Sequence, residues 1–77
     1  MTTGRTFKVL LAWDTEEKLW VTQVPALGDL STYGRTRQEA LDMTREAIAG
    51  FLEASAKQGL PIPDVPDPEL VDLEVAV

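Results

Sequence analysis

The side chains in this sequence that could do chemistry are carboxylates, lysines, arginines, hydroxyls and one tyrosine, because the chain contains neither cysteine nor histidine. Without cysteine there is no disulfide, no redox pair and no thiolate nucleophile. Without histidine there is no imidazole base, no Ser-His-Asp arrangement and no histidine metal site. Any catalytic site would therefore have to use carboxylates, lysines, the tyrosine and hydroxyls.

Carboxylates cluster between the first two apolar runs of the chain, at Asp14, Glu16 and Glu17. Two or three carboxylates on one turn could begin a divalent-cation site, because hard cations take several oxygen ligands. The same charges are typical of a solvated hairpin turn, and the sequence favours that interpretation. We therefore expect no metal site and no cofactor.

Arginines could form a basic patch with a neighbouring aromatic ring for stacking on a base. The residues concerned are Arg35, Arg37, Arg45 and Tyr33. Asp42 and Glu46 are interleaved with them, which favours surface ion pairs. The net charge of −6 also argues against direct nucleic-acid binding, since neutralising phosphates supplies most non-specific affinity.

The acidic excess lies at the end of the chain, because no basic residue follows Lys57. This acidic end would suit a basic partner, or it could simply keep a small protein soluble. The candidate partner-binding residues are its carboxylates, together with two aromatic side chains: Asp64, Asp67, Glu69, Asp72, Glu74, Trp20 and Tyr33. For Trp20, the alternative to a partner anchor is cross-strand packing with Trp13.

Three strands can be placed before the helix, over residues 7–13, 19–24 and 30–33. The polar residues 14–18 predict an antiparallel hairpin between the first two strands. Pro25 should end the second strand because it lacks a backbone N–H, but alternation does not decide which face of that strand meets the core.

A helix should follow, because Thr36 and Glu39 have the spacing of a capping box. Side chains then recur every three or four residues along one face of a helix: Ala40, Leu41, Thr44, Ala47, Ile48, Phe51, Leu52 and Ser55. Gly59 is a natural left-handed stop. Gly50 costs about 1 kcal/mol relative to alanine in a helix. We expect it where the helix closely approaches the sheet.

The chain closes with a proline-rich linker over residues 60–68 and an alternating apolar and acidic strand over 70–77. The predicted fold class is α+β, an antiparallel sheet of three to four strands with one helix packed on it, in the order β-β-β-α-β. Residues 1–77 should form a single domain with its core in residues 7–59.

Several of these runs resemble the HicB-like antitoxin family. They are FKVLLAWD at 7–14, YGRTRQEA at 33–40, REAI at 45–48 and GLPIP at 59–63. The resemblance implies a partial RNase H-like fold. It also implies a partner, since HicB antitoxins bind and occlude HicA toxins, which are small ribonucleases that cleave messenger RNA.

The leading hypothesis is therefore a non-catalytic HicB-like protein that binds a small basic HicA-like toxin. The alternative is a solitary, self-associating structural or regulatory domain, and a metal-dependent nuclease using Asp14 is the third. We expect a cytoplasmic homodimer or higher homo-oligomer, with no enzyme activity, no membrane segment and no DNA-binding domain within these residues.

Overall fold

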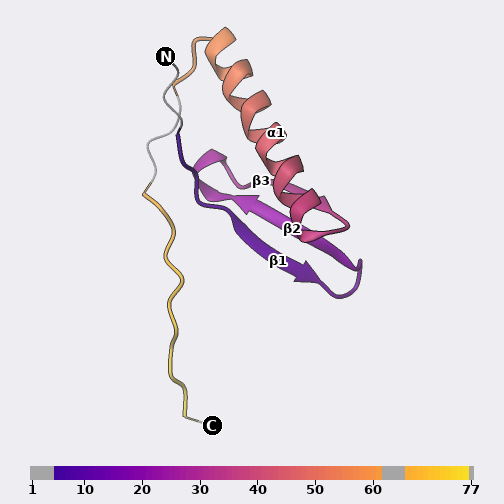
Figure 1. The fold of residues 1–77 in the computed structure, drawn as a ribbon. Helices are drawn as coiled ribbons and strands as arrows, with labels where there is room; N and C mark the ends of the chain where they lie inside the picture. The colour runs from indigo at the N-terminus through magenta and orange to yellow at the C-terminus, as the bar shows by residue number, and fades with distance from the viewer. Residues whose placement is uncertain (1–4, 62–65, 77) are drawn as a thin grey trace.

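The computed structural model describes residues 5–61 and 66–76, and it shows an α+β fold with one helix beside an antiparallel sheet (Figure 1). The sheet contains three strands in the order β1-β2-β3: β1 (Leu10–Asp14), β2 (Leu19–Val24) and β3 (Leu30–Gly34). Helix α1 (Arg37–Lys57) follows β3. The predicted class and the order of these four elements are confirmed.

The first strand is shorter at its start than the sequence predicted, since β1 begins at Leu10 and not at residue 7. Leu10 pairs with Gln23, one residue before the end of β2. Pro25 then begins a short 3-10 helix, η1 (Pro25–Leu27), so β2 has no residue opposite Phe7 or Lys8. This segment therefore runs on from β1 outside the sheet.

The sheet face that meets the helix is fixed by Thr22, whose hydroxyl lies 2.5 Å from that of Thr44 in α1. Leu11 and Thr32 are the partners of Thr22 on β1 and β3, so they share its face. Trp20 and Val24 share this face by alternation along β2. Alternation in the sequence did not decide which face of β2 meets the core. The structure shows that it is the face with Trp20, Thr22 and Val24.

The core is small and lies between α1 and the β2–β3 side of the sheet. Its buried apolar side chains among the described residues are Val24, Leu27 and Ala40. Leu27 enters the core from η1, a role that the strand pattern did not reveal. Helix α1 packs mainly on β3 and less on β2, which leaves β1 largely uncovered.

Both ends of α1 follow the local signals in the sequence. The Thr36 hydroxyl accepts a hydrogen bond of 3.0 Å from the Glu39 N–H, as expected for an N-cap. At the other end Gly59 adopts a positive φ of 68°. The N–H groups of Gly59 and Leu60 then donate to Ala56 and Ser55, which is a Schellman motif.

The surroundings of Gly34 and Gly50 differ sharply. A Cβ on Gly34 would collide with the backbone of Ala40 and lie 2.8 Å from the Glu39 carbonyl carbon, so the start of α1 needs glycine there. Gly50 is exposed, and a Cβ there would meet nothing within 4 Å. The prediction that Gly50 allows close approach to the sheet is therefore wrong.

The predicted C-terminal strand over residues 70–77 is also wrong for the part that the structure describes. Residues 66–76 are extended but pair with no strand, and they run away from the sheet and helix (Figure 1). Alternation predicts an amphipathic strand, but strand formation also requires a neighbour. Residues 62–65 of the predicted linker and Val77 lie outside the described residues. Over the described ranges, no helix is long and apolar enough to cross a membrane.

Candidate partner-binding surfaces

The acidic cluster near Asp14 forms the turn between β1 and β2. The Asp14 carboxylate accepts hydrogen bonds of 3.0 and 3.1 Å from the N–H groups of Glu16 and Glu17. The Lys18 N–H donates to the Asp14 carbonyl at 2.8 Å, and Lys18 adopts a positive φ of 57°. The Asp14 side chain therefore caps the turn, as Asp commonly does.

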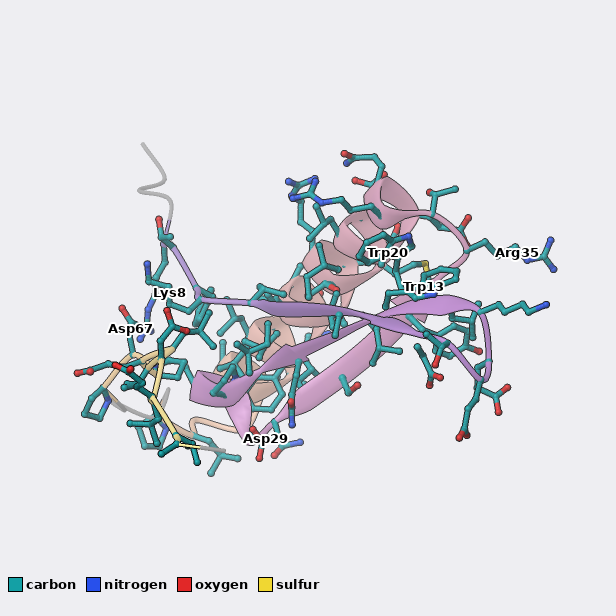
Figure 2. The ribbon with its side chains drawn as sticks, turned by 90° about the horizontal axis from the view of Figure 1, so that it is seen from below. Lys8, Trp13, Trp20, Asp29, Arg35 and Asp67 are labelled. Atoms are coloured by element: carbon teal, nitrogen blue, oxygen red, sulfur yellow. The ribbon has the colours of Figure 1, made fainter. Side chains whose placement is uncertain are left out.

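The arginines do not form one patch. Arg45 lies 3.4 Å from Asp42 on the exposed face of α1, which is the surface ion pair that the sequence favoured for this residue. Figure 2 shows Arg35 projecting away from the body of the protein, at the opposite end from Asp67. Neither Arg35 nor Arg37 has an ion pair with any residue in the described ranges.

The two tryptophans form a cross-strand pair, as the packing interpretation predicted. Trp13 and Trp20 are direct partners across β1 and β2, and their ring centroids lie 5.5 Å apart in an edge-to-face arrangement (Figure 2). Trp13 is 45% exposed, whereas Trp20 is partly buried. Of the two, Trp13 presents more surface to a partner.

Tyr33 lies on the sheet face opposite α1 and is 62% exposed. It is in register with Val21, which is in register with Ala12, so the three side chains form one row across the sheet. Leu10 and Leu19 lie on the same face by alternation. We call these five side chains the open sheet face. The candidate residues Trp20 and Tyr33 are therefore not brought together, since they lie on opposite faces.

The candidate acidic residues that the structure describes lie in one exposed segment, residues 66–76, which we call the acidic segment. Its carboxylates belong to Asp67, Glu69, Asp72 and Glu74, while Asp64 lies outside the described residues. Its apolar side chains are exposed too, with Leu73 at 82% and Val75 at 71%. One segment therefore presents both charge and apolar surface to solvent.

An open apolar groove of about 570 Å³ lies between α1 and the segment that precedes β1. Arg5 lies over the Phe7 ring at its edge, 5.0 Å from the ring centroid. The apolar lining comes from both sides of the groove: Phe7, Val9, Leu41, Ile48 and Leu52. Sequence reasoning missed this groove. The signal in the sequence was the apolar stripe along the helix, because this stripe is longer than β1 can cover.

Within residues 5–61 and 66–76, no three acidic side chains are placed to hold a metal ion. Comparison with known proteins adds no assignment, since no family model, no curated protein and no solved structure matches this chain.

Proposed function

We propose that this protein is a non-catalytic binding protein of the HicB antitoxin type, which binds and occludes a small basic HicA-like ribonuclease. The observation that carries the proposal is the acidic segment, in which exposed carboxylates alternate with apolar side chains and no basic residue intervenes. The sequence runs that resemble HicB proteins support the same assignment.

The physical basis is competition for a surface that binds phosphates. A ribonuclease must attract the RNA backbone, so its substrate groove is positively charged. The acidic segment presents Asp67, Glu69, Asp72 and Glu74 on an extended chain that can follow such a groove. The open sheet face, with Tyr33 at its β3 edge, would supply the apolar contact that charge alone does not provide.

Co-expression with the product of the neighbouring open reading frame, which we expect to encode a small basic protein, tests the proposal. We expect a stable complex in which the neighbour's ribonuclease activity is suppressed. Failure to form a complex, with a neighbour that is not toxic on its own, would contradict it.

A charge-neutralised variant then tests the role of the acidic segment. The variant carries Asp64→Asn, Asp67→Asn, Glu69→Gln, Asp72→Asn and Glu74→Gln. Its association rate should fall about tenfold or more at low salt and lose most of its salt dependence, because long-range charge mainly steers encounter.

The matched control removes the same charge elsewhere, with Glu16→Gln, Glu17→Gln, Asp42→Asn, Glu46→Gln and Glu53→Gln. It should change the rate much less. Equal effects in the two variants would mean that net charge, and not the acidic segment, governs association.

The second candidate function is self-association without a toxin. The small core and the position of β1 at the edge of the described sheet favour it, because an edge strand exposes unpaired backbone groups. A chain that stays monomeric at micromolar concentration in light scattering would exclude this function.

A further inference from the structure

We propose that the acidic segment of one copy pairs with the free edge of β1 in a second copy, and that Val71, Leu73 and Val75 fill the groove beside α1. Each copy has an apolar groove that its described residues leave open, and an acidic segment whose apolar side chains pack against no described strand. The proposal does not rest on the toxin hypothesis.

The first argument is the incomplete strand before β1. Phe7, Lys8 and Val9 continue the alternation of β1, yet the pairing of β1 with β2 stops at Leu10 and Gln23. An added strand would supply hydrogen bonds to this backbone along its other edge. It would also lie directly beside the groove, because Phe7 and Val9 line it.

The second argument is the match between the two surfaces. Val71 is 65% exposed, Leu73 82% and Val75 71%, and alternation places the three on one side of an extended chain. Exposing such a row to water is unfavourable, whereas Ile48 and Leu52 offer it an apolar wall.

Charge also matches across the proposed pairing. With its apolar side in the groove, the segment places Asp72 and Glu74 on the opposite sheet face, where Lys8 is exposed. Opposite charges on neighbouring strands are favourable. Among the described residues, the charged side chains that line the groove itself are Arg5 and Arg45, so no described carboxylate opposes the incoming acidic segment there.

The linker favours a second copy over the same copy. Prolines at positions 61, 63, 66 and 68 give the linker sequence a preference for stiff, extended chain. A stiff stretch resists the bend that would bring the segment back against the groove of its own copy. The segment as described runs away from the sheet and the helix of its own copy (Figure 1). Exchange of an identical element between copies needs no such bend.

Disulfide trapping tests the pairing, because the chain contains no cysteine. Two single variants, Val9→Cys and Leu73→Cys, are mixed and oxidised. We expect a covalent dimer linked between positions 9 and 73. Ala54→Cys, on the exposed side of α1, replaces Val9→Cys in the control mixture and should give little 54–73 product. A third chain carries both Val9→Cys and Leu73→Cys. If it forms a disulfide within one copy and no covalent dimer, the proposal is overturned.

Light scattering over a concentration series provides the second readout. The wild-type chain should reach twice its mass of 8.5 kDa. Val71→Thr, Leu73→Thr and Val75→Thr together should weaken the dimer at least about tenfold, since they remove buried apolar surface. These residues are exposed in the single copy, so its folding should not suffer.

The control variant changes the other side of the same segment, with Asp72→Thr, Glu74→Thr and Ala76→Thr. It should weaken the dimer by less than about threefold, as partly exposed ion pairs contribute little. A dimer that both triple variants leave intact would overturn the proposal. Added salt should preserve this dimer while weakening a toxin complex, so the two proposals can fail separately.

Discussion

The hydroxyl groups of Thr22 and Thr44 lie 2.5 Å apart and join β2 to α1 in the interior of the protein. Both residues are almost completely buried. Thr44 is 2.6 Å from the Ala40 carbonyl, to which it can donate, so its oxygen is free to accept the Thr22 proton. A chain of hydrogen bonds thus runs from the sheet into the helix backbone.

This relationship predicts coupling between the two threonines. Thr22→Val and Thr44→Val should each lower the free energy of unfolding by about 1 kcal/mol, because each removes a buried hydrogen bond. The double variant should lose less free energy of unfolding than the two single variants added together, by about 0.5 kcal/mol or more. With both hydroxyls removed, neither is left buried without its partner. Urea denaturation measures all three variants. Thr32→Val, on the same sheet row, is the matched control, and strict additivity would contradict the prediction.

The two glycines near and within α1 should respond to alanine with opposite signs. Gly34→Ala should destabilise the protein by about 1–3 kcal/mol, because its methyl group would press on the backbone at the start of α1. Gly50→Ala should stabilise it by about 1 kcal/mol, since the site is open and alanine favours helix. Thermal unfolding of both variants checks the pair. A destabilising Gly50→Ala would mean that something covers this helix face in solution.

The hydrogen bonds of Asp14 predict a structural role in the hairpin turn. Asp14→Ala should cost about 1 kcal/mol, because the N–H groups of Glu16 and Glu17 lose their acceptor. Asp14→Asn keeps a side-chain oxygen and should cost much less. Magnesium or manganese should leave the melting temperature unchanged. A metal-dependent rise that Asp14→Asn abolishes would instead support the nuclease hypothesis.

The helix cap gives a further prediction. Thr36→Ala should lower stability by about 1 kcal/mol, whereas Thr36→Ser should keep most of it, because serine also accepts from the Glu39 N–H. Circular dichroism during urea unfolding compares the two variants. If Thr36→Ala and Thr36→Ser were equally stable, the hydrogen bond of the cap would contribute little, and the packing of Ala40 would hold the start of the helix.

Features fixed by neighbours in the chain could be predicted from the sequence. Thr36 and Gly59 marked the ends of α1, and Pro25 marked the end of β2, because each acts within one turn of backbone. The turn role of Asp14 and the pairing of the tryptophans followed in the same way, once the hairpin was assumed.

Features that depend on distant partners could not be predicted. The alternation over residues 7–9 and 70–77 is the same whether a neighbouring strand is present or absent. Leu27 gave no signal because a single residue in a connection has no periodicity. Likewise, only the position of α1 over β3 shows that a groove lies beside β1 and that Gly50 faces solvent.

The edge-to-face tryptophans have a practical consequence, since they are the only two in the sequence. Fluorescence excited at wavelengths that only tryptophan absorbs therefore reports on the junction of β1 and β2, whereas far-ultraviolet dichroism is dominated by α1. The protein thus carries separate optical reporters for its hairpin and its helix. Coincident transitions in the two signals would establish all-or-none unfolding without any added label.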